Sequence, residues 1–356
     1  MAGSATAAKC VTLKGEMTRR IVLISTADGN SNEGRIVRNL HAVLQQTLQV
    51  RLVMTRLHKR SVFGALSGVL RQIRCVAQSD DVVIHSPFVL SAPAAFAARL
   101  LRKRLIAFVW DSYPVLIAGR RYDRRISRWL FDRFEILVPW LVTTKIIPTH
   151  DFYIDPKYHK AQVIPFWTGL TEHAGKGQTG VRGASGPRKI ALIGQINETR
   201  GVAQALLHLD KILVHPAEVH LFSRDPAPEI CAMPFEKLTV QHHGFLGHDA
   251  MLERLRGFDF GLVTLHPQFD MPGFPSKTLD YLSLSLPVLY FGRGLPAYTD
   301  LLLATGAGVV VTDLASLDLD EQADRLCDIA LARFAFVDKI IAKTGAFDHV
   351  FAEPVR

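Results

Sequence analysis

Short runs of hydrophobic residues alternate along this chain with longer segments whose hydrophobic residues recur every three or four positions. The first run, Ile21 to Ser25, is continuous, which is typical of a strand buried on both faces of a sheet. A turn-rich loop follows at residues 28–34, and residues 35–46 then show helical spacing. The pattern therefore predicts a strand, a glycine-containing loop and a helix, in that order.

The same alternation continues to the end of the chain, with one interruption. Further strands are predicted at residues 50–54, 82–85, 105–110, 145–148, 190–193, 218–222, 239–242, 260–265, 287–291 and 308–311. Helices are predicted at residues 62–76, 92–102, 124–137, 202–213, 250–255, 276–283, 297–304 and 320–336. Strands that alternate with helices form parallel sheets. The expected fold class is therefore α/β, with two tandem doubly wound, Rossmann-like domains that face each other across a cleft.

The interruption is a glycine-rich segment with almost no large hydrophobic residue, which is typical of a linker. We expect a disordered tail at residues 1–18, a first domain at residues 19–171 and a linker at residues 172–188. A second domain is expected at residues 189–336. Residues 337–356 are expected to form a helix or tail that returns to the first domain. Ligands of such sheets bind at the carboxyl ends of the strands, so the domain cleft is the natural active site.

The charge is divided unevenly between the two halves. The 356 residues carry a net charge of +9, but residues 1–170 hold 25 Lys/Arg against 11 Asp/Glu, and residues 171–356 hold 17 against 22. A basic half implies an anionic partner: nucleic acid, anionic lipid or a phosphorylated acceptor. Basic segments at residues 56–74, 99–104 and 120–133 interleave arginines with aliphatic and aromatic residues, which fits an anionic membrane surface, although a solvated basic face is the alternative. We see no nucleic-acid recognition motif, so nucleic acid is not expected as a partner.

The cellular compartment is predicted from two further patterns. No window reaches the roughly 18 uninterrupted apolar residues of a membrane span. The four cysteines are far apart and have no metal-like spacing. We expect a reduced cytoplasmic protein, peripheral on the cytoplasmic face of the inner membrane.

The segment from Gly273 to Asp280 has the chemistry of a nucleotide site. Gly273 allows close approach of the backbone, and a helix that starts near Ser276 offers free N–H groups to a phosphate, beside the charge of Lys277. Asp280 lies one turn further along, where a carboxylate can accept hydrogen bonds from ribose hydroxyls. The alternative is an ordinary capped helix with solvated charges.

Two glycine-containing loops after strands are further candidates. Gly194 to Gly201 follows a predicted strand, and Arg200 within it can pair with a diphosphate. The loop that contains Gly29, Asn30 and Gly34 follows the first predicted strand. A plain turn is the alternative for each loop.

These motifs and their order resemble the GT-B glycosyltransferases, in particular the retaining enzymes of family four (glycosyl transferases group 1). The resemblance extends from about residue 20 to residue 340. The loop from Gly194 to Gly201 matches the glycine loop that opens the second domain of these enzymes. The stretch from Phe274 to Val288 matches their Phe-Pro-Ser-Lys-x-x-Glu-Tyr-Leu-x-x-Gly-x-Pro-Val segment, with Asp280 in place of Glu and Ser285 in place of Gly.

The resemblance implies the roles of several residues. Donor binding would fall to Gly194, Gln195, Arg200, Gly273, Phe274, Ser276, Lys277 and Asp280. The loop that contains Gly29, Asn30 and Gly34 resembles the glycine loop of the first domain of GT-B glycosyltransferases, which implies a phosphate or acceptor loop. Pro272 stands where many of these enzymes carry a second acidic residue, and Gln195 stands near the position of an arginine in the Gly194 loop.

At the reaction centre of the family a His or a His-Asp pair is frequent. Trp110 stands here in place of the histidine, so Asp111 is the expected catalytic group, with His85 as a second candidate. A turn cap for Asp111 and a core or rim position for His85 are the alternatives.

The sequence therefore predicts a glycosyltransferase that moves a sugar from a nucleotide sugar to a lipid-linked or polysaccharide acceptor. The resemblance implies a retaining mechanism. There is no Asp-x-Asp motif at a strand end, so we expect no metal ion, and we expect no cofactor besides the nucleotide sugar. The alternatives are a nucleotide-sugar epimerase of the same fold and a non-catalytic basic protein that binds membranes or nucleic acid.

Overall fold

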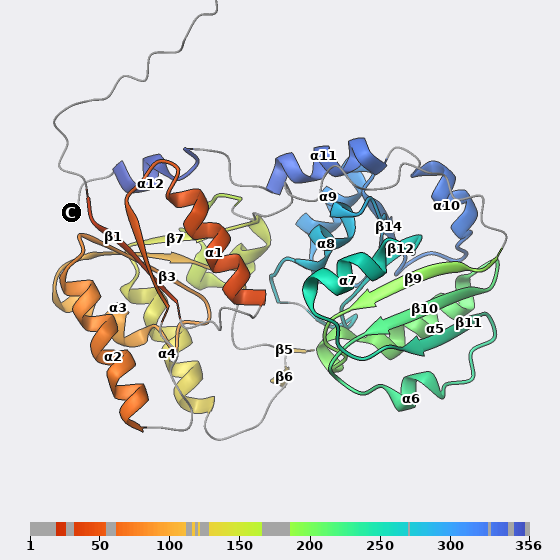
Figure 1. Ribbon diagram of the computed structural model, residues 1–356, viewed down its shortest axis with the longest axis horizontal. Coiled ribbons are helices and arrows are strands. Elements are labelled where there is room, and N and C mark those ends of the chain that lie inside the picture. Colours follow the sequence, from red (N-terminus) through yellow and green to blue (C-terminus); the bar gives the residue numbers. More distant parts are fainter. Residues whose placement is uncertain are drawn as a thin grey trace, which may run out of the picture.

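The computed structural model describes residues 19–25, 32–54, 62–111, 116–117, 120–121, 128–165, 186–269, 271–326, 329–340 and 345–352. Within these residues the chain forms two successive α/β domains, each built on a parallel six-stranded sheet (Figure 1). The predicted fold class, two tandem doubly wound domains, is confirmed.

The first sheet has the strand order β2-β1-β3-β4-β7-β8. Its strands are β1 (Ile21–Ser25), β2 (Val50–Met54), β3 (Asp81–His85), β4 (Arg104–Phe108), β7 (Thr144–Ile147) and β8 (Gln162–Val163). Every residue of β1, β3 and β4 is buried, because helices cover both faces of the sheet. A separate antiparallel pair consists of β5 (Leu116–Ile117) and β6 (Arg120–Arg121). The direction in which strands are added reverses between β1 and β3, which is the topological switch point of this sheet.

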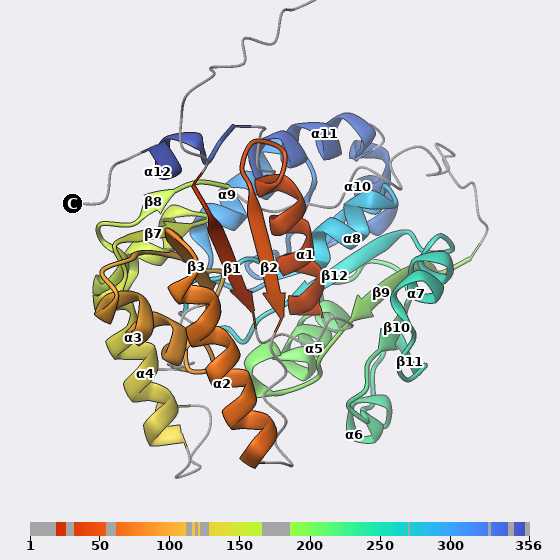
Figure 2. The ribbon, with the colours of Figure 1, turned by 60° about the vertical axis from the view of Figure 1, so that its left-hand side comes forward.

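Two layers of helices cover the first sheet. The hydrophobic residues of α1 (Asn32–Leu44) and α12 (Asp348–Ala352) pack on one face. On the other face lie α2 (Val62–Ala77), α3 (Ala92–Leu100) and α4 (Arg128–Leu141), side by side in Figures 1 and 2. Two 3₁₀ turns, η1 (His150–Ile154) and η2 (Pro156–Tyr158), follow β7.

The second sheet has the strand order β11-β10-β9-β12-β13-β14, with its switch point between β9 and β12. The strands are β9 (Arg188–Ile193), β10 (Ala217–Phe222), β11 (Leu238–His242), β12 (Phe260–Thr264), β13 (Val288–Phe291) and β14 (Gly308–Val310). On one face lie α5 (Val202–Ile212) and α10 (Leu319–Arg325). On the other lie α7 (His248–Leu255), α8 (Lys277–Ser283), α9 (Pro296–Thr305) and α11 (Ile329–Ile340). Two short elements complete the domain, η3 (Glu198–Arg200) and α6 (Pro228–Cys231).

Tyr281 of α8 occupies the gap where β9 and β12 separate. The two strands pair only at Phe260 with Ile190 and at Gly261 with Ala191. Beyond that point the Tyr281 hydroxyl accepts a hydrogen bond from Ile193 N (3.0 Å) and lies within hydrogen-bonding distance of Ala191 O (3.0 Å). A Cβ atom on Gly261 would overlap the Tyr281 ring, so the strand needs glycine there. The tyrosine therefore fixes α8 above the switch point.

The C-terminal helix α12 is bound to the first domain by a buried arginine. Arg104 makes a two-pronged ion pair with Asp81, at 2.7 and 2.8 Å. The same guanidinium donates to Val350 O (2.7 Å) and Phe351 O (3.1 Å) at the end of α12. Arg104 and Asp81 are almost fully buried, so each depends on the other for its charge compensation. Residues 348–352 thus lie on the domain that begins the chain.

Several predicted element boundaries were wrong. The helix predicted at 320–336 is two helices, α10 and α11, and α4 is shifted towards the C-terminus, where Pro139 lies inside its last turn. The helix expected from residue 35 begins at Asn32. The short elements β5, β6, β8, α6 and the 3₁₀ turns were not predicted, because they are shorter than the window in which a hydrophobic period can be read. The five residues of α12 lie within the helix or tail expected at residues 337–356.

The Tyr281 packing leads to a stability prediction. Replacing Gly261 by alanine forces the Tyr281 ring or β12 to move, and overpacking of this kind costs about 1–3 kcal/mol in the free energy of unfolding. Urea unfolding of G261A measures this loss. The matched control is G257A, whose new methyl group meets only Arg254 O at 3.6 Å. Equal stability of the two variants would contradict the packing described.

Candidate functional site

Two sequence motifs that lie some eighty residues apart meet at the carboxyl end of β9. Gly194 directly follows this strand, has a φ of +108°, and donates from its N–H to Phe222 O (2.9 Å). The Lys277 side chain, from the first residue of α8, lies against the α-carbon of Gly194, and a Cβ atom there would overlap the ammonium group. The loop therefore needs glycine both for its backbone angle and for the space that the lysine fills.

Arg200 is held at the same place by the packing of its own turn. Arg200 ends η3, and the next residue, Gly201, has a φ of +56°. Gly201 packs against the backbone of His266 so closely that a Cβ atom on it would lie 2.8 Å from the His266 Cα. The His266 N–H donates to Thr199 O (3.0 Å). These contacts tie the Gly194–Gly201 loop to the end of β12, on the side of the switch point where Lys277 lies.

The two cations influence each other electrostatically. Burial, and then the nearby Arg200 guanidinium, lower the pKa of Lys277 to about 7, against the opposing effect of Asp280 and Asp225. Holding a lysine and an arginine together in a half-buried site is unfavourable unless an anion joins them. The arrangement is suited to a group with more than one negative charge, such as a diphosphate.

Two acidic residues surround this pair of cations. Asp280, on α8, lies 4.0 Å from the Nε2 of His248, the first residue of α7. Asp225 follows β10 and accepts a hydrogen bond from Ile196 N (2.8 Å) within the Gly194–Gly201 loop. Neither Asp225 nor His248 was singled out from the sequence. The signal for Asp225 was present, since a polar Ser-Arg-Asp run follows a strand whose carboxyl end reaches the site.

In the first domain, His85 ends β3 and lies beneath the surface at the switch point. It is 2% exposed, and its ring stacks on Trp110 at a centroid distance of 4.4 Å. Nδ1 lies 2.8 Å from Ser86 O and Nε2 lies 2.8 Å from the Ser25 Oγ. Because a carbonyl only accepts, Nδ1 carries the proton and Nε2 accepts from the serine hydroxyl. These contacts match the alternative in which His85 is a buried core residue, since its ring binds and stacks on neighbours within the first domain.

Asp111 lies where the two domains touch. Its backbone forms an isolated antiparallel bridge with that of Gly273, and its carboxylate oxygen is 3.9 Å from the ideal Cβ position of that glycine. The Ser86 hydroxyl accepts from Trp110 N (3.1 Å) and Asp111 N (3.3 Å), which fixes the turn after β4. Asp111 itself is exposed. The catalytic candidate of the first domain and the donor segment of the second therefore adjoin directly.

The remaining predicted residues are distributed as follows. Phe274 is directed into the core, edge-on to Tyr298 at 5.6 Å between centroids, so its side chain does not face Lys277. Gln195 is exposed on the Gly194 loop, and Ser276 immediately precedes α8 without a side-chain cap to it. Gly34 is buried in the first turn of α1 rather than in a loop. Gly29 and Asn30 lie outside the described residues.

A second interdomain contact lies next to a cavity of about 520 Å³ between η1 and the start of α9. Asp151 accepts a hydrogen bond from Ala297 N (2.9 Å), so a residue of the first domain caps a helix of the second. Burial raises the pKa of Asp151. The cavity is lined by residues of both domains, including His150 and Pro272, but not by Lys277 or Arg200. We interpret it as part of the domain junction rather than of the site around Lys277.

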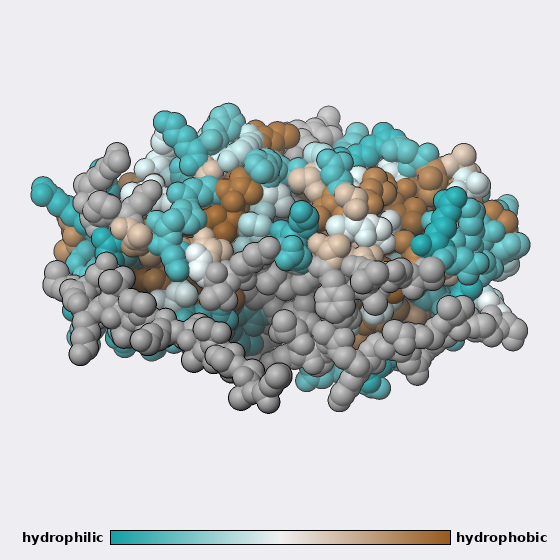
Figure 3. All heavy atoms as spheres, turned by 90° about the horizontal axis from the view of Figure 1, so that it is seen from above, coloured by the Kyte–Doolittle hydropathy of each residue, from teal (hydrophilic) through white to brown (hydrophobic). Residues whose placement is uncertain are grey.

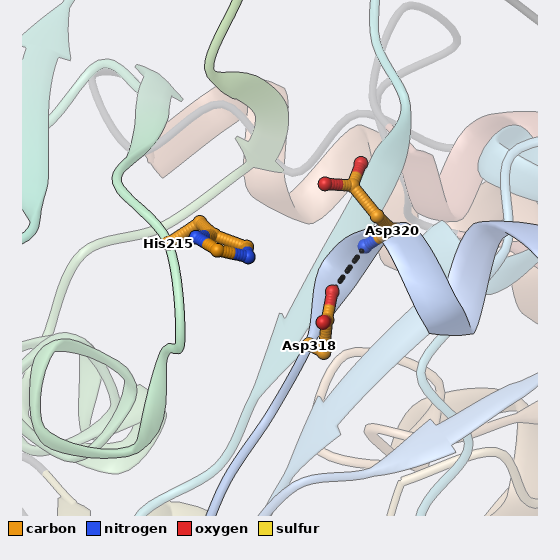
Figure 4. Close-up of side chains that lie close together, drawn as sticks. All are labelled: His215, Asp318 and Asp320. Carbon is orange, nitrogen blue, oxygen red and sulfur yellow. Dashed lines mark hydrogen bonds between the residues drawn. The ribbon is translucent and has the colours of Figure 1, made fainter.

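One group in the described part of the chain has three side chains in reach of a common metal ion. His215, Asp318 and Asp320 place ligand atoms within 4.8 Å of one another. Figure 4 shows the Asp320 N–H donating to the Asp318 carboxylate (2.9 Å). Asp318 caps α10, and Asp320 pairs with Arg188 at 2.5 Å. Both carboxylates thus have structural partners. Arg188 is the first residue of β9, so the group lies at the amino end of that strand, whereas the candidate site lies at its carboxyl end.

The fold is shared with proteins of known structure. AviGT4, a glycosyltransferase involved in avilamycin A biosynthesis, aligns with 94% of this chain and 96% of its own at a TM-score of 0.56 and 15% identity. TarM aligns with 80% of this chain and 57% of its own (TM-score 0.53, 12% identity). A putative UDP-N-acetylglucosamine 2-epimerase from Listeria monocytogenes aligns with 94% of this chain and 95% of its own (TM-score 0.51, 12% identity). No family model and no curated protein sequence matches the chain. The chain therefore has the GT-B fold, which glycosyltransferases and an epimerase have in common.

The buried position of His85 gives a pH prediction. Burial lowers the pKa of His85 to about 4, against an ordinary 6.5 in the unfolded chain. Between these values the unfolded chain binds a proton that the folded protein does not, so stability falls as the pH drops from 6.5 to 4. The slope due to this residue is at most about 1.4 kcal/mol per pH unit.

Urea unfolding of the wild type and H85Q across this range measures the difference in slope. NMR titration of the wild type provides a second readout that does not depend on the variant folding. A His85 ring that titrates near pH 6.5 would contradict the buried, hydrogen-bonded arrangement.

Proposed function

We propose that this protein is a glycosyltransferase that takes a sugar from a nucleoside diphosphate sugar. The observation that carries the proposal is the packing of Lys277 on Gly194 at the switch point of the second sheet, with Arg200 near enough to lower the pKa of the lysine. Asp111 of the first domain forms a backbone bridge with Gly273, in the same segment as Lys277. Ligands of open α/β sheets bind at such points. The fold shared with AviGT4 supports the reading.

In this proposal the two cations hold the diphosphate, and their charge stabilises it as it becomes the leaving group. Asp280 is placed one turn into α8, on the same side as Lys277, to accept hydrogen bonds from ribose hydroxyls. We further propose that transfer is retaining and needs no metal ion. Asp111 is the polar group proposed at the reacting sugar, because it adjoins Gly273 at the domain junction.

The acceptor is proposed to be lipid-linked or a growing glycan, with the first domain on the acceptor side. The basic charge of residues 1–170 suits an acceptor that carries phosphate or lies on an anionic surface. None of the helices in the described ranges combines the length and the apolar character that crossing a bilayer requires.

Binding of nucleoside diphosphates tests the role of the cations. K277M is expected to bind UDP or GDP, whichever stabilises the wild type, about 10–100-fold more weakly, because a charge-assisted contact to a phosphate is lost. Isothermal titration calorimetry gives the affinity. K189M, which removes an exposed lysine of β9, is the matched control and keeps wild-type affinity. Equal affinities of K277M and K189M would remove Lys277 from the site.

The affinity for the same nucleotide is expected to depend on pH in a defined direction. The pKa of Lys277 is about 7 in the empty site, and a bound diphosphate favours the protonated form and raises it. Binding is therefore strongest below pH 7 and weakens as the pH rises above 7, by at most tenfold per pH unit. K277R, whose charge does not titrate in this range, should lose this dependence. A wild-type affinity that is constant from pH 6 to pH 9 would contradict the assignment.

An epimerase is the second candidate, because the Listeria protein of that description has the same fold. The two activities are separated by the acceptor. A transferase releases nucleoside diphosphate in step with the glycosylated acceptor, whereas an epimerase interconverts UDP-N-acetylglucosamine with its 2-epimer without any acceptor. D280A should reduce nucleoside diphosphate release from the sugar donor in the first case. Epimer formation by the wild type alone would establish the second.

A further inference from the structure

The helices α2, α3 and α4 expose large hydrophobic side chains on their outer faces. Phe63 is 86% exposed, Leu100 83% and Trp140 73%. Other exposed hydrophobic residues of this layer are Leu66, Leu70, Ile73, Phe96, Leu101, Ile136 and Leu137. We call these ten side chains the apolar face of the first domain. Scattered single residues of this kind are normal on protein surfaces, but a concentration on three neighbouring helices is not.

The arrangement along α2 shows that this exposure is not a consequence of a weakly packed helix. Gly68, Gln72, Cys75 and Val76 form a buried stripe at helical spacing against the sheet. Phe63, Leu66, Leu70 and Ile73 repeat at the same spacing on the outer side. A helix that is hydrophobic on both sides normally packs on both sides. Among the residues that the structure describes, the sheet covers the inner side of α2, and the outer side is exposed.

The three helices are in contact, so their outer faces form one surface. Phe96 of α3 packs edge-on against Phe134 of α4 at 6.2 Å between ring centroids. On the other side of α3, the Gln72 side chain of α2 donates to Leu90 O (3.1 Å), just before α3 begins. Figure 2 shows the three helices side by side. Figure 3 shows a different side of the molecule, where hydrophilic residues extend over both domains and hydrophobic residues appear between them in separate groups.

Basic residues accompany the apolar face. Five arginines at or next to the outer sides of these helices are exposed: Arg71, Arg74, Arg99, Arg102 and Arg133. The acidic residues of α4 are Asp132, which is half-buried, and Glu135, which is 2% exposed and accepts a hydrogen bond from Val89 N (2.8 Å).

We propose that the outer faces of α2, α3 and α4 form the surface by which this protein docks on an anionic lipid bilayer. Hydrophobic side chains and a tryptophan with arginines beside them are the composition of helices that lie in the membrane interface. The arginines reach the headgroups, and anionic lipid increases the attraction. A protein partner would have to match the same apolar and basic surface with acidic residues. This inference goes beyond the proposed transferase activity and does not depend on it, because it concerns binding without any nucleotide.

Vesicle sedimentation tests the proposal with the full chain. The wild type is expected to bind vesicles of phosphatidylcholine with 30% phosphatidylglycerol at least tenfold more strongly than vesicles of phosphatidylcholine alone. The double variant L66Q/L70Q and the single variant W140Q should each weaken binding to the anionic vesicles by at least fivefold. The matched control is L207Q/L303Q, two leucines of the second domain that are 42% and 55% exposed, and it should bind as the wild type does.

The charge is tested separately. R71Q/R74Q should reduce the preference for anionic vesicles several-fold, and raising the salt concentration should have the same effect on the wild type. Absence of wild-type binding, or equal losses in L66Q/L70Q and L207Q/L303Q, would overturn the proposal.

Occupation of the apolar face by a second copy of the chain is the main alternative outcome. Sedimentation equilibrium without lipid distinguishes it. The proposal expects a monomer whose mass does not change in L66Q/L70Q. A wild-type dimer that this variant dissociates would assign the surface to self-association and overturn membrane docking. Nucleoside diphosphate binding should be unchanged in L66Q/L70Q in either case, so the outcome is independent of the proposed function.

Discussion

The position of the Tyr281 hydroxyl between β9 and β12 determines the geometry of the candidate site. At the switch point of the second sheet the two strands separate, and their backbone groups need new partners. Tyr281 lies within 3.0–3.2 Å of Ile193 N, Ala191 O and Leu262 O. Buried polar backbone groups are costly to leave without partners, so this contact is a strong constraint. Because Tyr281 is one turn after the start of α8, it also fixes where Lys277 and Asp280 lie.

The first domain has a comparable arrangement at its own switch point. Ser25 ends β1 and His85 ends β3. Their hydrogen bond joins the carboxyl ends of the two strands between which the direction of strand addition reverses. Trp110 stacks on His85, and the next residue, Asp111, forms the backbone bridge to Gly273. His85, Trp110 and Asp111 thus connect the switch point of the first sheet to Gly273 of the second domain. The capping of α9 by Asp151 and the return of α12 to Arg104 hold the domains together at other places.

Much of this arrangement was predictable from the sequence, for physical reasons that differ between parts. The alternation of strands and helices gave the fold class, because buried parallel strands have a continuous hydrophobic pattern that is hard to produce otherwise. The Gly194 loop and the Lys277 segment were predicted to bind one donor, and the structure brings them into contact. The resemblance to GT-B enzymes supplied the expectation that they belong together, which spacing alone did not.

Other features depend on tertiary packing that no local pattern contains. Phe274 lies within a motif of polar and small residues, but its side chain packs on Tyr298 of α9, a helix that comes later in the chain. His85 is buried where Trp110, from the turn after β4, stacks on it. Asp225, in the loop after β10, and His248, at the start of α7, reach the site only through the tertiary fold. The split between α10 and α11 was missed because the hydrophobic pattern continues across it.

The central claim is that Lys277, packed on Gly194, and the nearby Arg200 bind the diphosphate of a nucleotide sugar. A crystal structure of the protein with the nucleoside diphosphate that stabilises it most tests this directly. The account predicts phosphate oxygens within hydrogen-bonding distance of the Lys277 ammonium and the Arg200 guanidinium, with the ribose towards Asp280. A nucleotide bound elsewhere, for example in the cavity between η1 and α9, with Lys277 still packed on Gly194 and away from any phosphate, would contradict it.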